Sequence, residues 1–455
     1  MRPRLHRRRL VLAVAGLSAL AASTTLAGLG GGLRSAVGGV SIDAGGVVRI
    51  ATAEERLQMA DSIRRHVDAP PAEAARSTAR RVISLAGLQR AFDEQTTDGG
   101  LDDTVVHLAG LQRIDDIVID ESNNDILLVG PAGAWEVRDD GAVVSVDTGH
   151  SAMRLIDLVA ALASVEEARQ GGITCSIEPT AEGRRKLQAL LRRTKLRPGQ
   201  SPTTIEPAMR TAYGPQMIHI NGVPHDSRIA RTMVAADFEM KRIAMGLADS
   251  PVASLPSYLA MARNTAHASN ANPRWWMATD YGPVAHDQNR TAYRITGDRV
   301  RTMTETDLIG RDGDVRGDDK ADPVAQAWAN RMTDTYDELA VAMPVFADLE
   351  NVMDATVAAT LIVQEDLEGR SGLSLDPIRN AAGLEPTRYA APQSVDPQCS
   401  FIRGRKGWVV TASGGVDISG FEVVSNQIED PAVAEKAEAI LASRPADAAW
   451  FWDAD

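Results

Sequence analysis

The sequence predicts an α+β fold of several parts, in which hairpin-rich mixed sheets pack against helices. Short runs of Val, Ile and Leu, separated by Asn, Asp and Gly, are typical of strands joined by tight turns. Other stretches carry apolar residues three and four positions apart, as amphipathic helices do. A hydrophobic content of 44% in 455 residues is ample for a buried core.

Residues 1–27 are predicted to be a secretory signal peptide. MRPRLHRRR is a basic start, and a 13-residue apolar run over 10–22 follows it. Small residues favour cleavage after Ala27, with an uncleaved N-terminal anchor as the alternative. The run is shorter than the roughly 20 residues that span a bilayer. We therefore expect an exported protein of the periplasm, cell envelope or secreted space, which touches a membrane only through this signal if it is kept.

The charge of the chain limits its possible partners, and its two cysteines limit its possible disulfides. The formal charge is −13, and removing residues 1–27 removes five arginines and no acid, which makes it −18. So acidic a chain repels phosphate backbones, and we expect no nucleic-acid partner. Two cysteines, Cys175 and Cys399, allow one disulfide in an oxidising compartment. A buried structural thiol and a nucleophile are the alternatives for Cys175.

Residues 28–75 are predicted to form a Gly-rich lead, either flexible or a marginal strand over 28–50, followed by a helix. Residues 76–200 are predicted to form an N-terminal α+β region. Apolar spacing predicts the helices, and turn sequences such as ESNND and RDDGA delimit the strands. Thr180 is the expected N-cap of the last helix. In chain order the expected elements are helices at 51–66 and 78–95, strands at 104–110, 115–120, 125–131, 134–139 and 142–147, a helix at 151–169, a strand at 171–179 and a helix at 181–194.

After a linker at 195–207, two further regions are predicted. The central α+β region, 212–310, begins with a strand in PQMIHINGVP, continues with a long helix at 226–247 and ends in extended runs. The C-terminal region, 320–430, is predicted to be helical over 321–367 with a bend at Pro344, whose ring does not fit inside a straight helix. Irregular chain and a return to β structure follow, and a short helix is expected at 431–443.

Five motifs carry a resemblance to a known family. HLAGLQRIDDIVIDESNNDILLVGPAGAWEV, GGITCSIEPTAEGRRKLQ, VAADFEMKRIAMGL, RWWM and VTASGGVDI occur in this order. Together they resemble an uncharacterised family of exported planctomycete proteins, described only as a domain of unknown function. The resemblance spans roughly residues 78–425. It implies export and supplies no catalytic residues.

Common catalytic and metal-binding signatures are missing from the sequence. It contains no GxSxG elbow, no GxxxxGK[ST] loop, no GxGxxG after a strand, no HExxH and no CxxC. In the acidic loop that begins at Asp312, Arg316 and Pro323 stand where an EF-hand needs oxygen ligands. We therefore predict no bound metal and no cofactor.

The helix expected at 226–247 carries the weak catalytic candidates. Asp237 lies at the edge of its apolar stripe, where a carboxylate costs free energy unless it is paired. Lys241 follows four residues later, in the favourable order for an ion pair. The alternative makes Asp237 a general base in a pocket, tuned by partial burial. His225 and Asp226, in the loop before the helix where sites often lie, are the other candidates for a catalytic group. Asp226 or Ser227 is also what a helix N-cap requires, so a structural role explains these residues equally well.

The stretch RWWMATDYGPVAHDQN is the best candidate binding surface. Adjacent residues on a strand point to opposite faces, so one of Trp275 and Trp276 is expected to face solvent or a partner. Arg274 and Tyr281 complete the candidate site, because Trp, Tyr and Arg are favoured at interface hot spots. The alternative is that one ring fills the core and the other covers a helix.

Export, the missing signatures and this aromatic cluster favour a non-catalytic binding or structural module of the cell envelope or secreted space. The expected partner is an envelope or extracellular protein or a glycan. The alternative function is an extracytoplasmic hydrolase that uses an Asp/His site.

Overall fold

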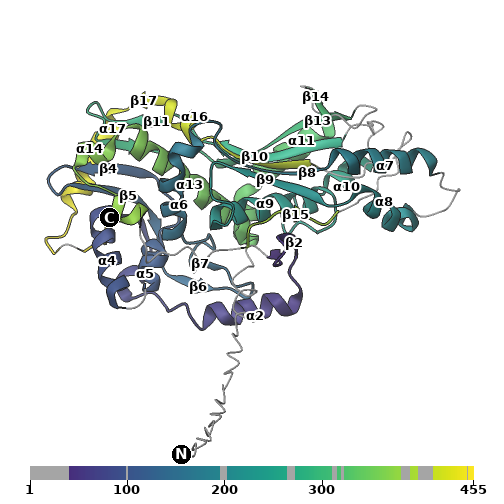
Figure 1. Cartoon of the computed structure of the whole chain (residues 1–455). Helices are drawn as coiled ribbons and strands as arrows, with labels where there is room; N and C mark the ends of the chain where they lie inside the picture. Colours follow the sequence, from purple (N-terminus) through teal and green to yellow (C-terminus); the bar gives the residue numbers. More distant parts are fainter. Residues whose placement is uncertain are drawn as a thin grey trace, which may run out of the picture.

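The computed structural model describes residues 40–98, 101–194, 202–263, 272–309, 315–318, 322–380, 390–397, 413–447 and 449–454. Its large sheets are mixed and helices pack against them, so the predicted α+β class is confirmed. Figure 1 shows the two large sheets at opposite ends of the molecule, with helices between them.

The first large sheet has nine strands in the order β1-β2-β15-β9-β8-β16-β10-β13-β14. The pairs β10–β16 and β2–β15 are parallel, and the others are antiparallel. Its strands are β1 (Val40–Ile42), β2 (Val47–Ile50), β8 (Ile173–Pro179), β9 (Gln216–Asn221), β10 (Asn272–Asp280), β13 (Arg299–Ile309), β14 (Val315–Asp318), β15 (Ser394–Val395) and β16 (Ser413–Ile418).

The second large sheet has seven strands in the order β17-β11-β12-β4-β5-β3-β18, and a two-stranded sheet pairs β6 with β7. Both large sheets combine strands from distant parts of the sequence. Their strands are β3 (Thr78–Ser84), β4 (Asp116–Asp120), β5 (Asp125–Ala132), β11 (Val284–His286), β12 (Ala292–Arg294), β17 (Gln427–Glu429) and β18 (Phe451–Asp453), with β6 (Trp135–Val137) and β7 (Val143–Ser145) forming the small sheet.

The helices come from both halves of the chain. The first half of the chain contributes α2 (Ala53–Arg64), α3 (Ala72–Ala75), α4 (Leu85–Asp98), α5 (Asp103–Val106), α6 (Leu155–Ala168), α7 (Ala181–Arg193), α8 (Glu206–Tyr213) and α9 (Arg228–Ala244). The second half contributes α10 (Tyr258–Arg263), α11 (Pro323–Asp334), α12 (Tyr336–Ala342), α13 (Pro344–Gln364), α14 (Leu367–Ser371), α15 (Asp376–Arg379), α16 (Gly420–Ser425) and α17 (Pro431–Ala442).

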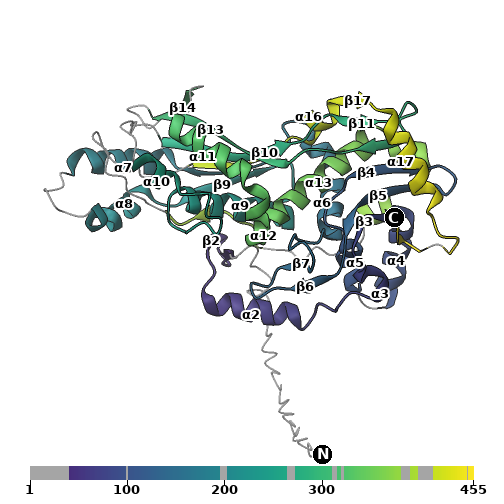
Figure 2. The ribbon, with the colours of Figure 1, turned by 180° about the vertical axis from the view of Figure 1, so that it is seen from behind.

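Helix α13 is the centre of the core. It is apolar on most sides, and 18 of its 21 residues are buried. It packs against α6, α9, α12 and α16, and the two views in Figures 1 and 2 place it with α6 between the sheets. Within the described residues, no helix is both long and apolar enough to cross a membrane.

Several expected elements differ in the structure. Residues 78–84 form strand β3 between β5 and β18, and only 85–98 are helical, because Val82 and Ile83 are buried within the sheet. Residues 103–110 form a short helix and a 3-10 turn instead of a strand, since the Asp102 carboxylate caps the backbone N–H of Val105. Residues 202–213, part of the predicted linker and beyond, are helical.

Of two further local predictions, the helix cap is confirmed and the helix bend is wrong. The Thr180 hydroxyl accepts a hydrogen bond of 2.9 Å from the N–H of Gly183 and caps α7. Pro344 does not bend one long helix, because it begins α13, where its missing N–H leaves no bond unmade. The division into the three sequence regions stays a prediction.

Candidate functional site

Asp237 and Lys241 form a buried ion pair on α9. Asp237 has no exposed surface, and its Oδ2 atom accepts a 2.7 Å hydrogen bond from Lys241 Nζ. Helix α9 packs on β8, β16 and β10, so the pair lies directly beneath the nine-stranded sheet. Gly414 of β16 makes room for it, because a Cβ there would lie 3.0 Å from Lys241 Cε. The predicted ion pair is present.

Burial dominates the chemistry of this region. It raises the pKa of Asp237, and the charge of Lys241 opposes the rise without cancelling it. Burial also raises the pKa of the Cys175 thiol, and the carboxylate of Asp237 adds to that effect. A thiol whose pKa is raised and which is 2% exposed is not a nucleophile. Cys399 lies outside the described residues, so the disulfide stays a prediction.

His225 and Asp226 do not join Asp237 in one site. His225 is exposed and its Nε2 atom lies 3.0 Å from the carbonyl of Ile220. Asp226 precedes α9, and 11 residues of helix at about 1.5 Å each place Asp237 roughly 16 Å along the axis. The N-cap is Ser227, whose hydroxyl accepts from the N–H of Ala230.

Trp275 belongs to the core. It is fully buried, and its ring makes edge contacts with Tyr258 of α10 and Trp328 of α11, each with centroids 5.0 Å apart. Its indole N–H donates to the carbonyl of Ala325. These contacts show that α10 and α11 cover the same face of the sheet as α9. Trp275 is therefore not available to a partner.

Trp276 lies on the opposite face, as strand alternation predicts. It is partly exposed, and its strand neighbours are Gly415 of β16 and Met303 of β13. Arg274 Cζ lies 6.0 Å from the ring centroid, at the limit of a cation–π contact. Because Gly415 has no side chain and Ser176 beyond it has a short one, no large side chain lies beside the Trp276 ring in that direction.

We call this surface the outer face of the nine-stranded sheet. Strand β9 shows it most clearly, since its six residues alternate strictly between buried and exposed. Register places the outward side chains in three rows across β9, β8, β16, β10 and β13. The rows are Met217, Glu178, Arg274 and Glu305; then His219, Ser176, Gly415, Trp276 and Met303; then Asn221, Thr174, Asp417, Ala278 and Arg301.

The outer face is nearly neutral in charge. Arg274 lies 3.7 Å from a carboxylate oxygen of Glu178 and 3.2 Å from one of Glu305. Arg301 and Asp417 add one charge of each sign. At about 4.8 Å between strands, the rows extend over roughly 19 Å. A wide, charge-balanced surface with one aromatic ring is suited to contact a partner.

Tyr281 is not on the outer face. Its hydroxyl donates a 2.7 Å hydrogen bond to Asp354 Oδ1 on α13. Burial raises the pKa of Tyr281, and the charge of Asp354 raises it further. Tyr281 thus belongs to a buried ionic cluster that the sequence does not reveal.

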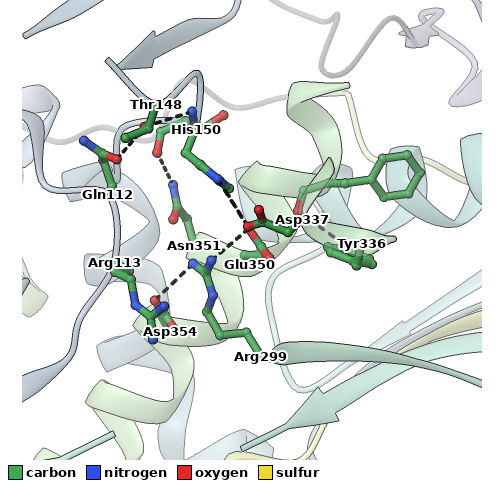
Figure 3. Close-up of polar contacts among 12 residues, drawn as sticks. Gln112, Arg113, Thr148, His150, Arg299, Tyr336, Asp337, Glu350, Asn351 and Asp354 are labelled. Atoms are coloured by element: carbon green, nitrogen blue, oxygen red, sulfur yellow. Dashed lines mark hydrogen bonds and ion pairs between the residues drawn. The ribbon is translucent and has the colours of Figure 1, made fainter. Parts of the chain in front are cut away.

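The ionic cluster joins α13 to the start of β13 (Figure 3). Glu350 and Asp354 lie one helical turn apart and are 2% and 1% exposed. The Arg299 guanidinium reaches both, at 3.2 Å from Glu350 Oε2 and 3.7 Å from Asp354 Oδ2. Burial raises the pKa of Asp354, and Arg299 opposes this rise. Arg299 has φ of +68°, a value that few non-glycine residues adopt.

The loop before β4 and the turn after β7 complete the ionic cluster. The backbone N–H of Ile114 donates to Asp354, and the Asn351 amide donates to the carbonyl of Ser151. His150 forms the outer rim, with Nε2 3.3 Å from Asp337 and Nδ1 3.8 Å from Glu350. The central groups of the cluster, Arg299 of β13 with Glu350 and Asp354 of α13, are buried and join a strand to the central helix, so we interpret the cluster as a structural junction.

No group of three or more His, Cys, Asp and Glu side chains is placed to hold a metal ion among the described residues. Most of the acidic loop at 311–322 lies outside them.

Residues 175–258 match DUF1598, a protein family of unknown function. The chain contains a DUF1598 domain. This domain runs from Cys175 on β8 through α7, α8, β9 and α9 to Tyr258, the first residue of α10. It confirms, for these residues, the resemblance to a domain of unknown function. No curated protein and no solved structure matches the chain.

Proposed function

We propose that the protein is an exported, non-catalytic binding module of the cell envelope or secreted space, and that the outer face binds a glycan. The observation that carries this proposal is the position of Trp276. It is a large aromatic ring on β10, an interior strand of the nine-stranded sheet, on the face opposite α9, α10 and α11. Large aromatic rings of this kind are favoured at binding surfaces.

The surroundings of the ring favour a glycan over a charged polymer. A nearly neutral face has no excess of either sign to attract a polyanion or a polycation. The C–H groups of one sugar unit pack on an indole, and the hydroxyls of neighbouring units along a glycan need donors and acceptors farther along the surface. Thr174, Ser176 and Asn221 supply hydroxyl and amide groups two or three strands away from Trp276.

The candidate residues do not favour the hydrolase alternative. Asp237 is closed to solvent and held by Lys241, and His225 and Asp226 lie far from it along α9. A general base must come within hydrogen-bond reach of its substrate. Neither the buried carboxylate nor the buried Cys175 thiol meets that condition.

The test measures pelleting with the glycan fraction of the source cell envelope, freed of protein and lipid. We expect the wild-type protein to pellet and Trp276→Ala to bind at least about tenfold more weakly, the loss typical of a hot-spot aromatic. Leu57→Ala is the matched control, because Leu57 on α2 is 59% exposed and lies on no part of the outer face. Far-ultraviolet circular dichroism checks that each variant folds.

Two outcomes would overturn this proposal. Equal pelleting of wild type and Trp276→Ala would remove the outer face as the binding surface. Binding that requires the protein of the envelope, and is absent from the purified glycan, would reject the glycan as partner.

A further inference from the structure

Helices α7 and α8 form a hairpin inserted between the paired strands β8 and β9. Their contact has its own small hydrophobic cluster of Leu187, Met209 and Tyr213, with Leu190 and Leu191 packed against it. The helices approach closely at Gly183, where a Cβ would lie 1.9 Å from the carbonyl oxygen of Tyr213. Figures 1 and 2 both show the hairpin projecting at the end of the molecule farthest from α4 and α17.

The hairpin carries a concentrated positive charge on an acidic chain. Over residues 184–193, RRKLQALLRR contains five cations and no carboxylate, whereas the whole chain has a formal charge of −13. Arg185, Lys186, Arg192 and Arg193 are exposed, and only Lys186 has an ion pair within α7, with Glu182. That pair is highly exposed and so is weak.

The four cations share the side of α7 that faces away from α8. Arg185 and Arg192 are seven residues apart, as are Lys186 and Arg193, and seven residues make about two turns. The residues between them on this side are the small Ala189 and the polar Gln188. The large apolar residues of α7 face α8 and pack in the small hydrophobic cluster between the two helices.

We propose that this exposed side of α7, formed by Arg185, Lys186, Arg192 and Arg193, docks on the anionic lipid headgroups of a membrane surface. Basic clusters bind such surfaces by charge alone, with no apolar contact. A protein partner needs an apolar centre in its interface, which this side of α7 lacks. A helix that projects from the body brings all four cations to a flat surface without inserting into it.

The negative charge of the body does not prevent this contact. Helix α7 has 13 residues and is therefore about 20 Å long. The Debye length at physiological ionic strength is about 8 Å, so most of the acidic body is screened from a surface that the exposed side of this projecting helix touches. The same argument predicts that the binding is lost at high salt.

The test measures co-sedimentation of the full chain with vesicles. We expect binding to phosphatidylcholine vesicles that contain about 30% phosphatidylglycerol, and none to pure phosphatidylcholine. The double variant Arg192→Gln/Arg193→Gln is expected to bind roughly 20-fold more weakly, because each cation near an anionic surface contributes about fivefold. Arg64→Gln/Arg65→Gln is the control, since these two arginines also lie together at the C-terminal end of an exposed helix, α2.

An equal loss in both double variants would show that only net charge matters and would overturn the proposal. So would equal binding to both kinds of vesicle, or no binding to either. Nucleic acid and an excess of non-sedimenting anionic vesicles are then each added as competitors. If both displace the protein equally well, it has a general affinity for polyanions, and the membrane is rejected as its specific partner. None of these results changes the outcome for Trp276, because the hairpin variants leave the outer face intact.

Discussion

Removing the cation of the buried pair on α9 is the sharpest test of its structural role. In Lys241→Met the methylenes of the lysine are largely kept, and Asp237 stays without exposed surface and without its partner. The native state must then hold Asp237 protonated. A carboxyl with an ordinary pKa of 3.8 is ionised at pH 7 in the unfolded chain, so the cost is about 4 kcal/mol at 1.36 kcal/mol per pH unit. This agrees with the about 3–5 kcal/mol for breaking a buried pair.

The sign of the pH dependence follows from the same pKa shift. Burial raises the pKa of Asp237 in the folded state, so between pH 3.8 and that raised value the native state binds more protons than the unfolded state. Stability therefore falls as pH rises through this window. The cost of Lys241→Met is expected to shrink from about 4 kcal/mol at pH 7 to about 2 kcal/mol at pH 5.

Urea denaturation followed by circular dichroism at the two pH values measures both quantities. The double variant Asp237→Leu/Lys241→Met is the control. We expect it to regain most of the lost stability at both pH values, because an apolar pair leaves no buried charge. A cost under about 1 kcal/mol at pH 7, or one independent of pH, would refute the reasoning.

Of three further predictions, two use the same denaturation measurements and the third uses labelling of a thiol. Trp275→Ala is expected to cost about 3–5 kcal/mol and Trp276→Ala under about 1 kcal/mol, because only Trp275 fills the core; equal costs in urea denaturation would contradict this. Arg299→Met leaves the buried carboxylates of α13 unpaired and is expected to cost about 3–5 kcal/mol, less at lower pH because burial raises the pKa of Asp354; a cost that grows on acidification would count against the ionic cluster. Cys175 is expected to resist a thiol reagent in the native protein and react fully in denaturant; rapid native labelling would reopen its role as a nucleophile.

Local patterns allow prediction wherever neighbours in sequence are also neighbours in space. Alternation in GGITCSIEP places Cys175 on one face with two isoleucines, and the structure buries all three. The spacing of Asp237 and Lys241 predicts their ion pair, and Thr180 its helix cap. In each case the partners are five residues apart or fewer, so secondary structure alone brings them together.

Contacts between distant segments could not be predicted in this way. Alternation shows that Trp275 and Trp276 face opposite ways, but which one is buried depends on the side that α10 and α11 cover. The ionic cluster brings together Tyr281, Arg299 and Asp354, which come from different elements and are separated by up to 73 residues. No local spacing marks such a group, because it forms only when α13 is surrounded by its neighbours.

The limits of the DUF1598 domain do not define an independent structural unit. Helix α9 lies within residues 175–258, yet it packs on β16, β10 and α13, which all lie outside them. On its own, the segment would expose the apolar side of α9 and the buried pair of Asp237 and Lys241.

The two proposed surfaces differ in whether they lie wholly within residues 175–258. The basic side of α7 lies wholly inside the domain, whereas the outer face needs Trp276 from β10 and Gly415 from β16. Membrane contact therefore depends on a hairpin with its own small core, and glycan contact depends on the assembled sheet, so a destabilised chain should lose the second before the first.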